Sequence, residues 1–103
     1  MLISVENDVI RALADPTRLH IVQLLADEEL CTCHLVARTG ARQTNVSNHL
    51  RLLREVGLVS SEQVGRYTWH RLVPEAADRL AETFTSLADR AAVGSGVRRA
   101  SCD

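Results

Sequence analysis

The amino-acid sequence predicts a mainly α-helical fold that contains one β-hairpin. Apolar residues make up 46% of the chain, but only one Phe, one Tyr and one Trp are among them. An aliphatic core of this kind suits packed helices better than stacked sheets. Apolar residues recur at helical spacing in most segments, whereas residues 58–73 are rich in Val, Thr and aromatic side chains. With 103 residues, the chain is expected to form one domain.

An Asp-Pro pair separates the first two predicted helices. Residues 4–14 have the pattern of a short amphipathic helix. Asp15 is then expected to cap a second helix, with Pro16 at its first position, where a missing N–H costs nothing. Residues 17–26 are apolar on nearly every side, so this second helix is expected at the centre of the core.

Two further helices are expected on either side of a glycine turn. Thr32 is the predicted N-cap of a short third helix that ends before Gly40, a residue type common just after a helix. The next helix is predicted from Arg42 to Val56, and its apolar residues Val46, Leu50 and Leu53 share one sector. This order of elements is typical of a helix-turn-helix.

The polar face of the fourth helix carries Gln43, Thr44, Ser47, Asn48 and Arg51. An ordinary solvated helix would carry Glu and Lys there. Short amides, hydroxyls and arginine are the groups that contact base edges and phosphates. The pattern predicts a DNA-recognition helix; the alternative is a polar surface helix that happens to lack acids.

The distribution of charge supports a basic central region. The whole chain has a net charge of −1, but residues 36–73 hold six arginines and two glutamates, a net charge of +4. Arg42, at the start of the fourth helix, is a further candidate DNA contact, and its role in starting the helix stays open.

Residues 58–64 and 67–73 are predicted to form a hairpin joined at Gly65-Arg66. A hairpin directly after a helix-turn-helix is the wing of a winged helix-turn-helix. Arg66 at its tip is expected to enter the minor groove or to contact phosphate. The alternative for Arg66 is a solvated turn residue.

Pro74 opens a last predicted helix, which runs to about Ala92 and has a wide apolar stripe. Because it follows the complete winged core, we expect it to pack with the first helix against a second copy, forming a homodimer. The alternative is that it covers the core of its own chain. Residues 1–93 then form a DNA-binding and dimerisation domain, and residues 94–103 a flexible tail with Cys102. The expected dimer contacts are Val5, Val9, Leu80, Phe84 and Leu87.

No apolar run approaches the roughly 20 residues that span a bilayer, and the N-terminus lacks the pattern of a signal peptide. We therefore expect a cytoplasmic protein without a membrane partner. Two of the three cysteines, Cys31 and Cys33, are two positions apart, where a mutual disulfide would be strained. Free thiols are expected instead, which could bind a metal, take part in catalysis or have no special role.

Four segments together resemble the ArsR/SmtB family of bacterial metal- and metalloid-responsive repressors: ALADPTRLHIVQLL, ELCTCHL, QTNVSNHLRLLREVGLV and GRYTWHRL. The resemblance implies a winged-helix homodimer that binds its own operator and leaves it when a toxic metal or metalloid binds. It also implies that Ser47 and Asn48 face the major groove. The segment ELC-x-C resembles the thiolate site of the arsenic/antimony and cadmium/lead branches, although Val36 stands where the arsenic subgroup has a third cysteine.

The chemistry of the thiols limits which ions the site could bind. If Cys31 lies just before the third helix and Cys33 in its first turn, both sulfurs can turn to one side, and the helix dipole favours the thiolate. Trivalent arsenic and antimony favour three thiolates, so Cys102 is the expected third ligand; its alternative is a stray tail thiol. His34 and His20 are candidates for a mixed site for a divalent ion. Zinc is less favoured, because the last helix has no histidine for the family's zinc/cobalt-type site.

The sequence therefore predicts an arsenic(III)- or antimony(III)-responsive transcriptional repressor that binds double-stranded operator DNA as a dimer. The alternatives are a cadmium- or lead(II)-responsive repressor and a redox- or sulfur-responsive repressor of the same fold. We do not expect an enzyme, since no catalytic motif accompanies the cysteines.

Overall fold

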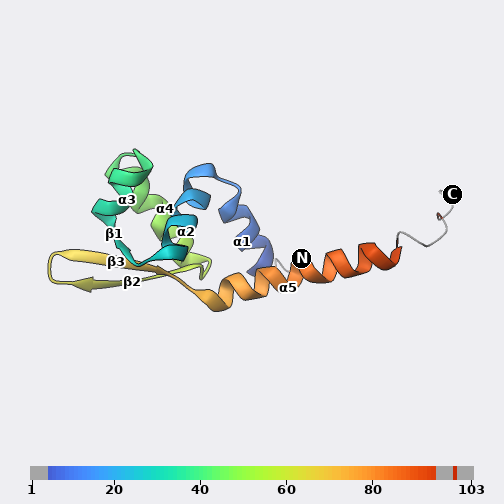
Figure 1. The fold of residues 1–103 in the computed structure, drawn as a ribbon. Helices are drawn as coiled ribbons and strands as arrows, with labels where there is room; N and C mark the ends of the chain where they lie inside the picture. The colour runs from blue at the N-terminus through green and yellow to red at the C-terminus, as the bar shows by residue number, and fades with distance from the viewer. Residues whose placement is uncertain (1–4, 95–98, 100–103) are drawn as a thin grey trace.

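The computed structural model describes residues 5–94 and residue 99, and their helices and strands follow the predicted order (Figure 1). The one addition is a two-residue strand before the third helix, which was not predicted. The elements are α1 (Val5–Leu13), α2 (Pro16–Asp27), β1 (Leu30–Cys31), α3 (Thr32–Thr39), α4 (Gln43–Glu55), β2 (Val59–Val64), β3 (Tyr67–Leu72) and α5 (Pro74–Gly94).

Local signals fix the start of α2 and the turn between α3 and α4. The Asp15 carboxylate accepts the backbone N–H of Arg18 at 3.0 Å, and Pro16 takes the first helical position, as predicted. Gly40 ends α3 with a φ of 72°, and its N–H donates to the Val36 carbonyl at 3.0 Å. A residue with a Cβ would be strained in this left-handed conformation.

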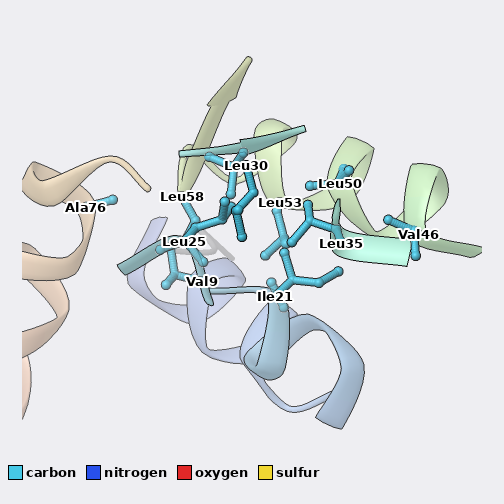
Figure 2. Packing of buried hydrophobic residues seen from close by; sticks show 12 residues of the cluster. Val9, Ile21, Leu25, Leu30, Leu35, Val46, Leu50, Leu53, Leu58 and Ala76 are labelled. Carbon is cyan, nitrogen blue, oxygen red and sulfur yellow. The ribbon is translucent and has the colours of Figure 1, made fainter. Parts of the chain in front are cut away.

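Aliphatic side chains from α1 to α4 and from the hairpin form the core (Figure 2). Val46, Leu50 and Leu53 of α4 are at most 1% exposed, which confirms the predicted apolar sector. From α2 only Ile21 and Leu25 are fully buried. Helix α2 packs against α1, α3, α4 and β3, as expected of a central helix, while its other sides remain partly open to solvent. The remaining buried apolar residues are Val9, Ala12, Leu30, Cys31, Leu35, Leu58, Val59 and Ala76.

The three strands form an antiparallel sheet in the order β1-β3-β2. The predicted hairpin of β2 and β3 pairs Val64 with Tyr67 around its tip. On its other edge β3 pairs with β1, so that Cys31 lies opposite Trp69 and Leu30 opposite His70. The short strand β1 thus attaches the start of α3 directly to the wing.

Helix α5 leaves the body of the domain after its first turns (Figure 1). Ala76 is buried and Leu80 packs against the core, but Phe84 and Leu87 are 54% and 47% exposed. Helix α5 therefore covers the core of its own chain only near Pro74. Over the residues described, no helix has the length and apolar character needed to cross a membrane.

Candidate functional site

The polar face of α4 is free of contacts that would occupy it. All five predicted side chains of this face, Gln43, Thr44, Ser47, Asn48 and Arg51, are exposed. Arg42 is the N-cap residue with an extended backbone, and its side chain makes no capping hydrogen bond. The exposed guanidinium of Arg42 therefore remains available beside the start of the helix.

His49 anchors α4 to the start of α2, a contact that sequence reasoning missed. Its Nδ1 lies 3.2 Å from a terminal nitrogen of Arg18, whose Nε donates to the Ala12 carbonyl at 2.6 Å. Its Nε2 lies 3.9 Å from the Asp15 carboxylate. The hydrogen bond from the Arg18 backbone lowers the pKa of Asp15 below its usual value, and so keeps this carboxylate charged. These contacts hold α4 against the start of α2, beside the apolar packing of its buried face.

The tip of the wing and the start of α4 lie beside the thiol segment. Arg66 is exposed at the turn between β2 and β3, as predicted. An open pocket of about 190 Å³ is lined by Cys31, Thr32, Cys33, Gln43, Arg66, Tyr67 and Thr68. Two predicted DNA contacts and two predicted metal ligands therefore share one surface depression.

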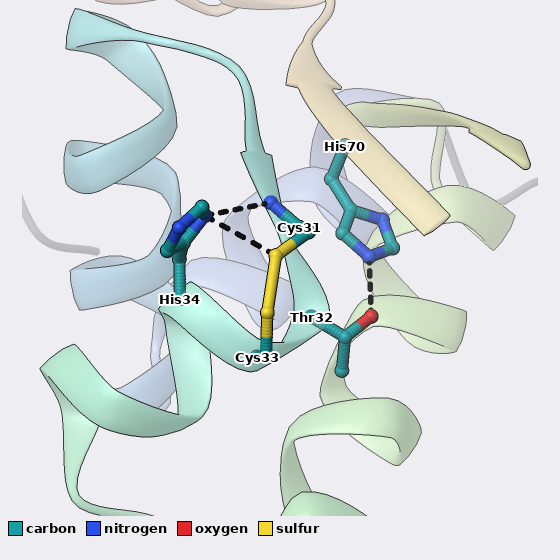
Figure 3. Close-up of a disulfide and its surroundings, with 5 residues drawn as sticks. All are labelled: Cys31, Thr32, Cys33, His34 and His70. Atoms are coloured by element: carbon teal, nitrogen blue, oxygen red, sulfur yellow. Dashed lines mark hydrogen bonds between the residues drawn. A yellow bond between two sulfur atoms is a disulfide. The ribbon is translucent and has the colours of Figure 1, made fainter. Parts of the chain in front are cut away.

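Cys31 and Cys33 are joined by a disulfide (Figure 3). The expectation that these residues would not pair is wrong. The reason is the bend of the chain, which is extended at Cys31 (φ −83°, ψ 165°) and helical from the next residue. The bend turns both sulfurs to the same side and brings the Cα atoms to 5.4 Å, within the normal range for a disulfide.

The N-cap of α3 is Cys31, not Thr32 as predicted. Thr32 is already helical, and its hydroxyl is hydrogen-bonded to Nε2 of His70 at 2.9 Å instead. His34, in the first turn of α3, contacts the N-cap residue. Its Nδ1 accepts the Cys31 backbone N–H at 3.4 Å and lies 3.2 Å from the Cys31 sulfur.

Cys31, Cys33 and His34 together form a candidate metal-binding group. Their ligand atoms lie within 4.8 Å of one another; Cys31 is buried, and the other two residues are exposed. Once reduced, the two cysteines offer soft thiolates and His34 offers an imidazole nitrogen, a donor set that suits thiophilic ions. From the sequence, His34 is predicted only as a candidate ligand of a mixed site for a divalent ion. Cys102, the predicted third ligand, lies outside the described residues.

The predicted dimer residues fall into two groups. Val9 is part of the core of its own chain, and the side chain of Val5 lies outside the described part. Leu80 also packs against the core of its own chain, whereas Phe84 and Leu87 are exposed on the outer part of α5. An apolar pocket of about 320 Å³, lined by Ile10, Leu13, Ala14, Leu80 and Phe84, lies between α1 and α5.

A helix-turn-helix followed by an arginine-tipped hairpin, with an acid-free polar face on its second helix, defines a winged-helix DNA-binding protein. Residues 15–61 match the model of the bacterial regulatory proteins of the arsR family. A crystal structure of a possible transcriptional regulator for arsenical resistance is 35% identical, with a TM-score of 0.72 over 88% of this chain and 98% of that one. The chain belongs to the ArsR family, as the sequence resemblance indicated.

Two curated relatives are similar to a large part of the chain. The transcriptional repressor SmtB homolog of Synechocystis sp. is 40% identical over 80 residues, which cover 70% of this chain and 61% of the relative. The arsenical resistance operon repressor of Escherichia coli is 45% identical over 65 residues, which cover 62% of this chain and 56% of the relative. The aligned part thus spans little more than half the length of these relatives.

Proposed function

We propose that this protein is a dimeric transcriptional repressor that binds operator DNA through α4 and the wing. It leaves the DNA when arsenic(III) or antimony(III) binds the reduced thiols of Cys31 and Cys33. The main support is the pocket shared by the cysteines, Gln43 and Arg66. An ion bound by the thiols would lie beside both DNA-contacting elements.

The release follows from a coupling free energy between the two sites. Ion binding draws the start of α3 around the sulfurs, and α3 is joined to α4 by the short turn of Gly40 and Ala41. A shift of α3 is therefore passed to the recognition helix, and the two helices of the dimer lose the spacing that the operator requires. A coupling of about 1–3 kcal/mol is typical, and DNA must weaken ion binding by the same factor.

The identity of the third ligand determines whether the site prefers a trivalent metalloid or a divalent metal ion. A trivalent metalloid prefers a third sulfur, which Cys102 would supply from the same or the partner chain. His34 would instead complete a mixed sulfur and nitrogen site, which suits cadmium, lead or zinc better. Two of the similar proteins are named for arsenical resistance, which supports the metalloid, whereas the SmtB homolog is not.

Dimerisation is supported by the apolar surface of α5. Phe84 and Leu87 are large and exposed, and Phe84 also lines the apolar pocket between α1 and α5. A second copy related by a two-fold axis would cover this surface and would place two α4 helices on one palindromic duplex.

The test is DNA binding by the full chain under reducing conditions, on a labelled duplex from the region upstream of its gene. Arsenite, antimonite and Cd(II) are titrated against the complex, and fluorescence anisotropy reports release. Loss of the response in the double variant Cys31→Ser, Cys33→Ser is expected. Arsenite-driven release that persists in this variant would show that the ion binds elsewhere.

Two single variants identify the third ligand. Cys102→Ser is expected to weaken the arsenite response, and His34→Ala is expected to weaken the Cd(II) response more than the arsenite response. Direct binding can be followed through Trp69, the only tryptophan of the chain, whose ring centroid lies 5.9 Å from that of His34. An arsenite response that is unchanged by Cys102→Ser would remove the tail from the site.

The disulfide supports a second candidate, a redox-responsive repressor. Its formation removes two electrons and two protons from Cys31 and Cys33 and therefore needs an oxidant, such as a peroxide or an oxidised thiol. In this case diamide alone would release the DNA, and a monothiol reductant would restore binding. In the metalloid case release needs no oxidant and is reversed by a competing dithiol.

A further inference from the structure

His70 is the one buried polar side chain among the described residues, and neither the core nor the thiol site accounts for it. It lies on β3 and is 1% exposed. Its two ring nitrogens are hydrogen-bonded to different elements: Nε2 to the Thr32 hydroxyl at 2.9 Å, and Nδ1 to the Ser61 hydroxyl at 2.7 Å. Figure 3 shows the first of these bonds beside the cysteine pair.

The protonation state of His70 determines which groups of this network donate hydrogen bonds and which accept them. Burial, together with the nearby charge of Arg54, lowers the pKa of His70 to about 4, so the imidazole is neutral near pH 7. A neutral imidazole has one N–H and one lone pair, so one hydroxyl donates to it and the other accepts from it. No buried nitrogen or oxygen of the described side chains is left without a hydrogen-bond partner.

The two ends of the network lie in the sensing and the DNA-binding parts of the molecule. Thr32 stands between the two cysteines, at the first position of α3. Ser61 is on β2 of the wing, and its hydroxyl accepts a hydrogen bond from Arg54, in the last turn of α4, at 3.4 Å. Thr32, His70, Ser61 and Arg54 therefore connect the thiol pair to the wing and to the far end of the recognition helix.

We propose that His70 is a positioning residue that couples the state of the Cys31–Cys33 pair to the wing and to Arg54. The inference rests on the proposed function and adds a route separate from the Gly40-Ala41 turn. The Thr32–His70 bond is present while the two sulfurs are joined in the disulfide. An ion held between the reduced thiols keeps the sulfurs further apart than the disulfide does, so the backbone at Thr32 shifts and its bond to Nε2 is weakened. A buried imidazole that loses this partner shifts β3, and with β3 the wing.

The test compares the release factor, defined as the ratio of operator dissociation constants with and without bound inducer. Arsenite and Cd(II) are used as the probes. Thr32→Val is close in shape but lacks the hydroxyl, and it is expected to reduce the release factor about tenfold, the effect of one buried hydrogen bond. Thr32→Ser keeps a hydroxyl and is expected to restore the release factor. Ser61→Ala, which leaves the thiol segment unchanged, is expected to reduce it as well.

Two controls separate coupling from folding and from ion binding. Thr83→Val removes a threonine hydroxyl that bonds only within α5, to the Arg79 carbonyl, and is expected to keep the wild-type release factor. Ion affinity of the DNA-free protein, read from Trp69 emission, is expected to stay at the wild-type value in Ser61→Ala.

The outcomes distinguish the two proposals. A wild-type release factor in Thr32→Val and in Ser61→Ala, with normal release of the wild-type protein, overturns the role of His70 and leaves the proposed function intact. Absence of release from the wild-type protein with both ions overturns the metal-responsive function and the coupling together.

Discussion

The stability of the protein is expected to fall between pH 6.5 and pH 4 because of His70. The folded state holds the pKa of this residue at about 4, whereas the ordinary pKa of a histidine, expected in the unfolded chain, is 6.5. In this window the unfolded chain binds a proton that the folded chain excludes. Stability is therefore complete above pH 6.5 and is lost as the pH falls towards 4.

The size of the effect follows from the two pKa values. A difference of one unit corresponds to 1.36 kcal/mol between the protonation states. The linkage relation then gives a loss of about 2 kcal/mol at pH 5 relative to pH 7, and about 3 kcal/mol at pH 4. Because His70 is only 1% exposed, solvent screening reduces this value little.

The assay is urea unfolding at fixed protein concentration and at several pH values, monitored by far-UV circular dichroism. His70→Asn removes the titrating group and keeps a polar side chain, so its free energy of unfolding is expected to change less with pH than that of the wild type. The exposed His20→Asn exchange is the matched control for loss of one imidazole. Parallel pH profiles of wild type and His70→Asn between pH 7 and pH 5 would refute the reasoning.

Three further predictions concern the core, a cap and the wing. Leu53→Ala removes a side chain that is 0% exposed and is expected to lower the free energy of unfolding by about 3 kcal/mol in urea; a loss below 1 kcal/mol would mean that the core rearranges. Asp15→Ala removes the N-cap of α2 and is expected to lower the free energy of unfolding by about 1 kcal/mol in the same assay. At pH 2 the wild-type carboxyl is protonated more often, so the difference between wild type and variant is expected to be smaller. Arg66→Ala is expected to weaken operator binding and to reduce the salt slope of log K by about one unit; an unchanged slope would mean that Arg66 contacts no phosphate.

The sequence was informative wherever a pattern repeats over several residues. Val46, Leu50 and Leu53 recur with the helical period, so both the buried and the exposed faces of α4 were predicted correctly. The glycine after α3 and the Asp-Pro pair before α2 have steric and hydrogen-bonding roles that depend only on local chain geometry. These features define the winged helix.

Contacts between distant segments were not predicted. The strand β1 has two residues, too few for any periodicity, and it exists because β3 offers it a free edge. The same pairing made Cys31 rather than Thr32 the N-cap and left the Thr32 hydroxyl facing His70. In the sequence His70 is one polar residue in an aromatic strand, and only the alternation of inward and outward residues along β3 hints at its burial.

The bend at residues 31–33 is the point at which the two proposed coupling paths begin. Cys31 is extended and the next residue is helical, so the sulfurs of Cys31 and Cys33 meet on one side while Thr32 bonds to His70. A change at the sulfurs therefore acts on the backbone that holds Thr32. In the proposed mechanism this change reaches α4 along α3 through the Gly40 turn, and it reaches the wing across the sheet through His70. Since both proposed paths begin at one bend, ion binding and disulfide formation would act on the same segment, and they would impose different distances between the two sulfurs.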